Sequence, residues 1–352
     1  MEPEQREPAS ARVSRRAIVR RATQAGAALA ASGPLAAWLA ACGAGPSARI
    51  IPSPTASPTT APSPTATPDT RPVTVAITGD VMLGRSVGRR ILATNDRYPF
   101  NGVADFLSGY DLTVGNLECV VSTLGSPQPK EYTFEGPPLG FQRVAAAGYD
   151  IVSVANNHSG DYGPAAFTDM LAHLPAHGLT ALGGGKDLAQ AHTPVIRTVR
   201  STTIGFLAYC EIGPTSFAAT ATTPGHAWLD ATLMTHDIRA LRPKVDYLIV
   251  FTHWGIEYHD IESGEQEYMA QTAIEAGADF VVGAHPHVIQ PSSSYRGKPI
   301  VYSLGNFVFD EMYSEDVRHG NVLTLTIQGK KLLRWSLRTS RIGDYGAPVW
   351  VS

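Results

Sequence analysis

Residues 280–287 read Phe-Val-Val-Gly-Ala-His-Pro-His, a short apolar run that ends in two histidines one residue apart. The apolar run is typical of a buried strand. On an extended chain alternate side chains point to the same face, so we expect His285 and His287 to point the same way. Imidazole nitrogens are common ligands of divalent metals. The stretch therefore predicts a strand that presents two metal ligands at its carboxyl end.

Four other apolar runs also end in polar residues of the kind that bind metals. Helical patterns at 164–177 and 266–276 lie between such runs and indicate βαβ units. Parallel strands with crossover helices gather their carboxyl ends at one edge of a sheet, so we predict an α/β fold with a site there. The runs and the residues after them are 73–77 with Asp80, 112–114 with Asn116 and Glu118, 151–154 with Asn156, Asn157 and His158, and 247–251 with His253.

The C-terminal part has a different pattern. Residues 321–327 and 332–338 flank Gln328-Gly329-Lys330, which predicts a hairpin and an antiparallel, sandwich-like portion. No internal repeat or second linker follows residue 73, so we predict that residues 73–352 form one domain or a closely fused pair.

The strand-end residues form a set that suits two divalent cations held close together. Asp80 would bind the first, Glu118 would bridge, Asn157 would offer its carbonyl oxygen, and His253, His285 and His287 would offer imidazole nitrogens. His158 could stay off the metals and act on a leaving group. Each residue also has an ordinary alternative: a turn or cap for Asp80 and for Asn156-Asn157, a surface carboxylate for Glu118 and a core position for His253. Their shared position at predicted strand ends favours the metal hypothesis.

The N-terminal residues 1–41 are predicted to be a twin-arginine-type lipoprotein signal peptide. Arg15-Arg16 precede an apolar stretch at 22–41, and Leu39-Ala40-Ala41-Cys42 resembles a lipobox in which Cys42 receives the lipid. A retained transmembrane helix is the alternative, which the Ala and Gly content and Pro34 disfavour. We therefore expect an exported lipoprotein, anchored to the outer face of the cell membrane.

Residues 42–72 are predicted to be a disordered linker, because the part at 51–72 holds seven prolines and six threonines and no apolar run. The rest of the composition is that of a globular protein, with 43% hydrophobic residues. A net charge of -3 offers no basic field for a phosphate backbone, so we expect no nucleic acid partner. Cys119 and Cys210 are expected to be buried small residues and not a disulfide.

Six motifs, in order, resemble the capsule-synthesis CapA family, also called poly-γ-glutamate synthesis proteins. The resemblance implies the fold of calcineurin-like metallophosphoesterases, a sandwich of two mixed β-sheets flanked by helices. The motifs are Gly79-Asp80-Val81-Met82-Leu83-Gly84-Arg85, Asn116-Leu117-Glu118, Ala155-Asn156-Asn157-His158, His253-Trp254-Gly255-Ile256-Glu257, Gly283-Ala284-His285-Pro286-His287 and Tyr302-Ser303-Leu304-Gly305-Asn306-Phe307.

The resemblance implies the same metal ligands and His158 as the catalytic residue. It also shows a departure, because the histidine of the superfamily's first block is Met82 here, and loss of an imidazole should weaken one metal position. The metals implied are Mn, Fe, Zn or Mg. Four further residues are expected to contact substrate or to support the ligands: Arg85, Asn116, Asn156 and Asn306.

Two functions follow as hypotheses. The first is a metal-dependent hydrolase of a phosphoester at the cell envelope, which His158 favours. The second is an accessory role in making, exporting or anchoring an anionic polymer such as poly-γ-glutamate, with capsule-synthesis membrane proteins as possible partners. A nucleotidase is a third, disfavoured hypothesis, because such enzymes usually add a C-terminal substrate domain that we do not expect here.

Overall fold

The structure is a computed structural model that describes residues 69–310 and 313–351. The predicted signal peptide, the lipidation site Cys42 and the linker up to residue 68 lie outside the described residues. Within the described ranges, no helix is both long enough and apolar enough to cross a membrane.

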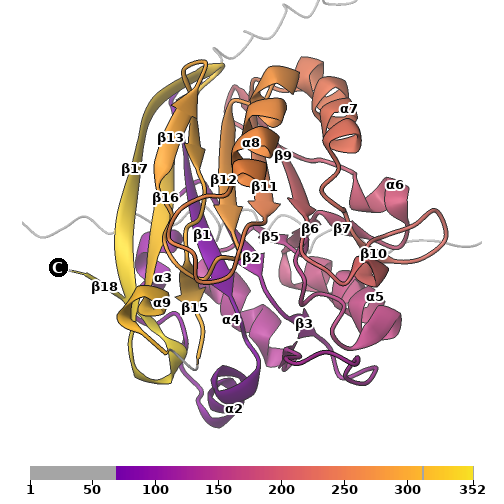
Figure 1. Cartoon of the computed structure of the whole chain (residues 1–352). Helices are drawn as coiled ribbons and strands as arrows, with labels where there is room; N and C mark the ends of the chain where they lie inside the picture. The colour runs from indigo at the N-terminus through magenta and orange to yellow at the C-terminus, as the bar shows by residue number, and fades with distance from the viewer. Residues whose placement is uncertain (1–68, 311–312, 352) are drawn as a thin grey trace, which may run out of the picture. The chain divides into compact units, whose positions relative to one another are not determined.

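The described residues form two large mixed sheets (Figure 1). In the first, β1, β2, β5 and β6 are parallel, β15 pairs with β1, and β16 runs antiparallel to β1. Its strand order is β18-β17-β16-β1-β2-β5-β6. Its strands are β1 (Val73–Val81), β2 (Leu112–Leu117), β5 (Ile151–Ser153), β6 (Thr180–Leu182), β15 (Asn306–Val308), β16 (His319–Gln328), β17 (Lys331–Ile342) and β18 (Pro348–Trp350).

The second sheet has the order β13-β14-β12-β11-β9-β8, with β9, β11, β12 and β14 parallel. Its strands are β8 (Val195–Val199), β9 (Thr202–Cys210), β11 (Tyr247–His253), β12 (Phe280–Ala284), β13 (Ser292–Tyr295) and β14 (Lys298–Val301). Two short strand pairs lie apart from these sheets: β3 (Val120–Val121) with β4 (Glu135–Gly136), and β7 (Gly184–Gly185) with β10 (Gly225–His226).

Alternation along the strands explains why the sheets stack. In β11, Tyr247, Ile249 and Phe251 face a core shared by both sheets, whereas Leu248 and Val250 face the opposite side. Val75 and Ile77 of β1 enter the shared core from the other sheet. The inner faces of the two sheets therefore bury each other's apolar residues.

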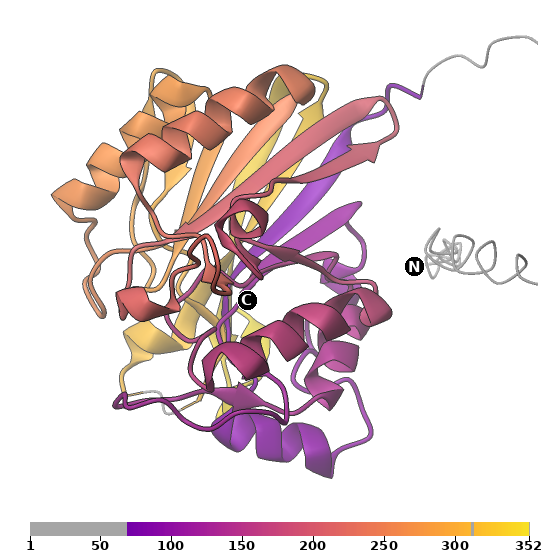
Figure 2. The ribbon, with the colours of Figure 1, turned by 90° about the vertical axis from the view of Figure 1, so that its right-hand side faces the viewer.

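Helices cover the two outer faces (Figure 2). Residues of α2, α4 and α5 pack in the core on the outer face of the first sheet, and those of α7 and α8 in the core on the second. The helices are α2 (Arg85–Ala93), α3 (Ala104–Leu107), α4 (Leu139–Ala147), α5 (Gly163–His173), α6 (Leu188–Ala191), α7 (Ala231–Leu241), α8 (Gly264–Ala276) and α9 (Glu315–Arg318).

The predicted fold is confirmed: the five predicted strands are β1, β2, β5, β11 and β12, and the two helical patterns become α5, extended by a 3₁₀ turn, and α8. The hairpin around Gly329 is also present, as β16 and β17. It does not form a separate portion, because β16 pairs with β1 and extends the first sheet.

Gly79 allows β1 to approach the turn before β15 closely. The amide of Asp80 donates a hydrogen bond to the carbonyl oxygen of Gly305 at 3.1 Å. A Cβ on residue 79 would lie only 1.9 Å from that same oxygen. Glycine at this position therefore fixes the backbone that carries Asp80.

We expect Gly79→Ala to lower the free energy of unfolding by about 1–3 kcal/mol, because the two backbones must separate. Urea unfolding followed by circular dichroism measures this change. Gly264→Ala at the start of α8 is the control, since no neighbouring atom lies within 4 Å of its Cβ position. It should change the free energy by less than about 1 kcal/mol. Equal effects of the two substitutions would contradict the close-approach argument.

Candidate metal centre

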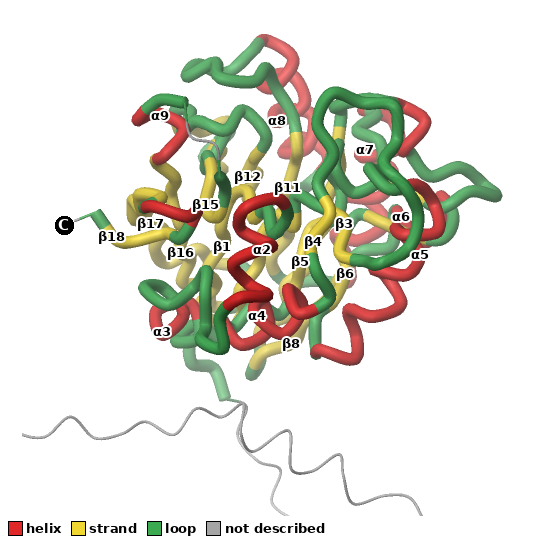
Figure 3. Tube along the Cα trace, turned by 90° about the horizontal axis from the view of Figure 1, so that it is seen from below, coloured by secondary structure: helices red, strands yellow, loops and turns green. Residues whose placement is uncertain are grey.

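The ends of strands from both sheets carry the six residues that we predicted as metal ligands, and each is at most 5% exposed. The first sheet supplies three of them, from β1 and from the residues after β2 and β5, and the second supplies the other three. Figure 3 views the two sheets from the side where these strands end. The residues are Asp80, Glu118, Asn157, His253, His285 and His287.

Asp80 and His287 form one part of the cluster. His287 Nδ1 lies 3.5 Å from Asp80 Oδ2 and 3.0 Å from Asn306 Oδ1. The pairing of β1 with β2 and β15 is irregular at Asp80, and such bulges redirect side chains near active sites. Asn306 thus supports an imidazole, as one of the two roles that we expected for it.

Asn157 and His253 form the other part. His253 Nε2 lies 2.8 Å from Asn157 Oδ1. The amide of Asn116 lies 3.2 Å from His253 Nδ1 and donates to Asp80 Oδ1 at 2.8 Å, so Asn116 connects the two parts. The amide of Asn156 in turn donates to Asn116 Oδ1 at 3.0 Å. Asn116 and Asn156 hold the cluster together through hydrogen bonds.

Glu118 lies between the two parts. Its Oε1 is 3.5 Å from His253 Nε2 and 3.9 Å from His287 Nε2. Two atoms that bind the same ion at about 2.1 Å lie at most about 4.2 Å apart, so these spacings suit shared ions. Glu118, His285 and His287 each offer a ligand atom within 4.8 Å of the others.

Buried polar atoms without partners also favour a cation here. Both carboxylate oxygens of Glu118 and Nδ1 of His285 have no hydrogen-bond partner among the described residues. Buried polar groups in native proteins are nearly always paired. The donor set therefore fits a divalent metal.

The backbone of this region differs from our prediction. We expected His285 and His287 to lie on an extended chain, but their φ angles are 99° and 62°. Tyr258, whose ring packs 6.0 Å from that of His287, also has a positive φ of 63°. A left-handed residue with a Cβ costs about 1–2 kcal/mol, and such strain is common at functional sites. The imidazoles thus meet through left-handed backbone and not through strand alternation.

The pKa values reflect a dense, buried set of ionisable groups. Burial, and next the Asp80 carboxylate, raise the pKa of Glu118 well above its usual value. Burial and neighbouring imidazoles lower the pKa of His253 and His285. Burial opposes protonation of His287, but contact with Asp80 raises its pKa. The raised pKa of Glu118 and the lowered pKa values of His253 and His285 each disfavour the charged form of a buried group.

We expect the metal-free protein to lose stability as the pH falls from 7 to 5. Burial lowers the pKa of His158 and His226 to about 4, against about 6.5 in an unfolded chain. Below pH 6.5 the unfolded chain binds protons that the folded one excludes, so each of these two histidines should lower the free energy of unfolding by up to about 1.4 kcal/mol per pH unit. Urea unfolding after chelation measures this slope.

His226 provides the comparison variant, because it is fully buried and neither ring nitrogen has a hydrogen-bond partner within the described part of the chain. His226→Leu should lower the slope by up to about 1.4 kcal/mol per pH unit. Stability that rises between pH 7 and 5 in the original protein would show that the groups with raised pKa values, His287 and Glu118, outweigh those with lowered ones.

His158 lines the cavity beside the proposed ligands. Its Nδ1 contacts Asp161, which forms an ion pair with Lys130. His158 Nδ1 lies 2.6 Å from Asp161 Oδ2, and the ring stacks on Phe134 at 3.9 Å between centroids. Lys130 donates to Asp161 Oδ1 at 2.8 Å and lies 3.1 Å from His158 Nδ1. No hydrogen bond joins His158 Nε2 to another described residue, so this nitrogen is available to a bound molecule.

A family model described as bacterial capsule synthesis protein PGA_cap matches residues 74–311. The chain belongs to the PGA_cap family. The capsule biosynthesis protein CapA of Bacillus anthracis is 31% identical over 247 residues, which covers 68% of this chain and 60% of that protein. The PGA biosynthesis protein CapA of Bacillus subtilis is 30% identical over 242 residues, covering 68% and 64%. The chain therefore spans less than two thirds of the length of these two relatives.

A solved structure supports the fold assignment. It is a Staphylococcus aureus protein assigned as a 5′-nucleotidase and crystallised with α-ketoglutarate, with a TM-score of 0.50 and 14% identity. The match covers 79% of this chain and 55% of that one. The fold of this PGA_cap protein is accordingly that of metallophosphoesterase-like proteins.

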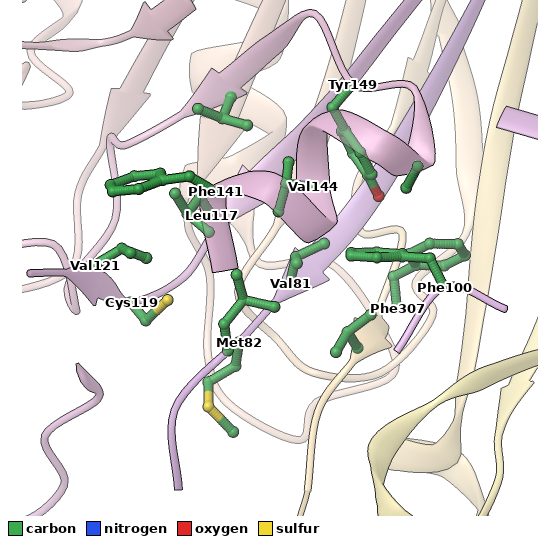
Figure 4. Close-up of a cluster of buried hydrophobic side chains, with 14 of the residues drawn as sticks. Val81, Met82, Phe100, Leu117, Cys119, Val121, Phe141, Val144, Tyr149 and Phe307 are labelled. Atoms are coloured by element: carbon green, nitrogen blue, oxygen red, sulfur yellow. The ribbon is translucent and has the colours of Figure 1, made fainter. Parts of the chain in front are cut away.

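Met82, which we expected to stand where the resembling superfamily has a histidine, packs in the core of this PGA_cap protein. Its side chain is fully buried in the core on the outer face of the first sheet (Figure 4). Its sulfur accepts a hydrogen bond from the amide of Gly84 at 2.9 Å.

Arg85 is held by groups of the protein beside the proposed metal site. Its guanidinium pairs with Asp310 and lies 4.7 Å from the centre of the Phe134 ring. It also lines the cavity next to His158. The positive charge is therefore already compensated within the protein.

The sequence analysis missed several residues beside the ligands of this PGA_cap protein. Asp161 follows His158 by three residues, and a His-x-x-Asp search would have found it. Lys130 and Phe134 come from a long irregular segment with no period to mark them. Glu257 lies within a motif quoted above but was given no role, and Tyr258 follows it in the exposed loop after β11. Cys119 and Cys210 are buried and free, as predicted.

Proposed function

We propose that this PGA_cap protein is a cell-envelope, metal-dependent hydrolase of the metallophosphoesterase type, linked to capsule or poly-γ-glutamate synthesis. The names of its relatives support the link to capsule and polymer synthesis. The observation that carries the enzymatic part is the buried Glu118 carboxylate, whose oxygens accept no hydrogen bond from the described residues and lie between two groups of ligand atoms.

Six side chains would hold the metal. Asp80 and His287 would bind one ion, Asn157, His253 and His285 the other, and Glu118 would bridge them. When bound, such ions lower the pKa of a coordinated water and stabilise negative charge on a phosphoryl oxygen. Mn, Fe, Zn and Mg all remain candidates for this oxygen and nitrogen donor set.

His158 is the proposed catalytic residue. Its Nδ1–H donates to Asp161, which leaves the lone pair of Nε2 directed to the cavity that it lines. The lowered pKa, about 4 through burial, keeps the ring neutral at pH 7 and able to accept a proton. Stacking on Phe134 fixes the plane of the ring. His158 would thus exchange a proton with the reacting group at Nε2.

The location and anchoring of the protein are part of the proposal. Export by a twin-arginine signal and a lipid on Cys42 would tether residues 73–352 to the outer face of the membrane through the Pro/Thr-rich linker. There the domain could meet an anionic polymer or a phosphoester of the envelope, together with capsule-synthesis membrane proteins. Mass spectrometry of the mature N-terminus should find the lipid on Cys42, and an intact Met1 would contradict this part.

The alternative is a non-hydrolytic accessory protein for the synthesis, export or anchoring of an anionic polymer. The missing ligand at Met82 favours it, because loss of an imidazole weakens one metal position. In this case the metal would bind glutamyl carboxylates. The two functions share the metal and differ only in turnover.

The deciding experiment measures metal and turnover together. We expect the purified protein to contain Mn, Fe or Zn by elemental mass spectrometry and to hydrolyse bis(p-nitrophenyl) phosphate. Chelation should abolish the turnover, and addition of the metal should restore it. Bound metal without turnover would reject the hydrolase and leave the accessory role. Absence of bound metal under all loading conditions would count against both.

A further inference from the structure

A small cavity of about 60 Å³ lies next to the ligand cluster. His158, His287 and Asn306 line its inner side. Its lining also includes Tyr132, Tyr258 and Tyr313, which come from three distant chain segments and are 48%, 54% and 70% exposed. Phenol rings therefore surround the entrance to the proposed metal site.

The uncompensated charge at this entrance is negative. Glu257 lines the cavity, and among the described residues it takes part in no hydrogen bond or ion pair. The cation of the same lining, Arg85, already pairs with Asp310 and lies over the rings of Phe134 and Phe309. A further anionic group of a substrate would therefore be repelled by Glu257, whereas a cation would be attracted.

Tyr258 is held in place for such a contact. Its left-handed backbone, with φ 63°, and a 2.8 Å hydrogen bond from its amide to the carbonyl of Pro286 fix the ring beside His287. A phenol is neutral at pH 7 because its ordinary pKa is about 10. A neutral ring next to a carboxylate is a favourable surface for an ammonium group.

We propose that Glu257 and the three tyrosines bind an ammonium group of the substrate. The substrate would therefore be a phosphoester that also carries a positive charge. The inference rests on the proposed hydrolase, whose metal would take the phosphoryl group. An ammonium group also occurs at the amino end of a γ-glutamyl chain, which is the second possible source of the same chemistry. The negative entrance favours the phosphoester, because a γ-glutamyl chain brings additional carboxylates.

Two phosphodiesters that differ only in charge test this inference. They are p-nitrophenyl phosphocholine and p-nitrophenyl 3,3-dimethylbutyl phosphate, in which carbon replaces the quaternary nitrogen. With the metal-loaded full chain, we expect kcat/KM to be about tenfold higher for the cationic ester, since ring faces and a carboxylate both favour the cation. Glu257→Gln should reduce the preference to about twofold, and 1 M salt should weaken it.

Glu131→Gln is the control, because Glu131 is an exposed carboxylate one residue from Tyr132 that does not line the cavity. It should keep the tenfold preference. Equal rates for the two esters, or a preference unchanged by Glu257→Gln, would overturn the inference while leaving the hydrolase in place.

A binding measurement separates this failure from a failure of the proposed function. On the metal-free full chain, saturation-transfer NMR should detect choline bound more strongly than 3,3-dimethylbutanol, and Glu257→Gln should remove the difference. This result does not depend on turnover. Phosphocholine should also compete with choline better than γ-glutamyl-glutamate does, and the reverse order would overturn the choice of a phosphoester.

Discussion

Replacement of His158 by alanine is expected to lower kcat for bis(p-nitrophenyl) phosphate by about 10²–10⁴-fold, the usual contribution of general acid–base catalysis. The imidazole is neutral, its Nδ1 is held by Asp161, and its Nε2 has no partner among the described residues. Alanine removes the ring nitrogen that would exchange a proton with bound substrate. Steady-state kinetics with metal-saturated protein measures the loss.

The metal content of His158→Ala separates a catalytic role of His158 from a role in metal binding. His158 is not one of the six proposed ligands, so elemental analysis should find the same metal in His158→Ala as in the original protein. Asp161→Asn is a second comparison, since the amide still accepts from Lys130 but no longer offers a carboxylate to His158 Nδ1. We expect a smaller loss of kcat and an altered pH profile. Loss of metal from His158→Ala, or unchanged turnover, would remove His158 from catalysis.

The sequence predicted most of the fold because buried strands appear in it as regular apolar runs. Residues that alternate between two cores, such as Ile249 and Val250, give a run with no polar interruption, and the polar residue after it marks the strand end. Parallel connection then brings these ends to one edge. This is why the positions of Asp80, Glu118 and His253 could be predicted from separate parts of the chain.

What the sequence could not predict depends on irregular backbone. Lys130 and Phe134 reach His158 from a loop with no period, and the positive φ angles of His285 and His287 have no sequence signature in a non-glycine residue. Arg85 pairs with Asp310, which lies more than two hundred residues later in the chain. Such contacts are set by tertiary packing and not by local propensity.

Replacement of Glu118 by leucine is expected to have opposite effects on stability with and without metal. In the metal-free protein the fully buried Glu118 has two oxygens without partners and a raised pKa, so an apolar side chain of similar size should stabilise the fold by about 1–3 kcal/mol. With metal, the original protein should gain about 2.7 kcal/mol at a concentration of 100 Kd, and Glu118→Leu should gain little. Thermal unfolding with and without Mn²⁺ measures both differences.

Opposite effects of Glu118→Leu on stability with and without metal would distinguish a metal ligand from a structural carboxylate. A carboxylate that stabilised the fold through hydrogen bonds would make Glu118→Leu less stable under both conditions.

Glu118→Asp is the matched control, because it keeps the charge and loses one methylene, and it should retain part of the gain on metal addition. Calorimetry should find metal affinity lowered by more than about 100-fold in Glu118→Leu, beyond the effect of losing a residue that only supports a ligand. A leucine variant that is less stable with and without Mn²⁺ would mean that the two groups of ligand atoms share no cation through Glu118.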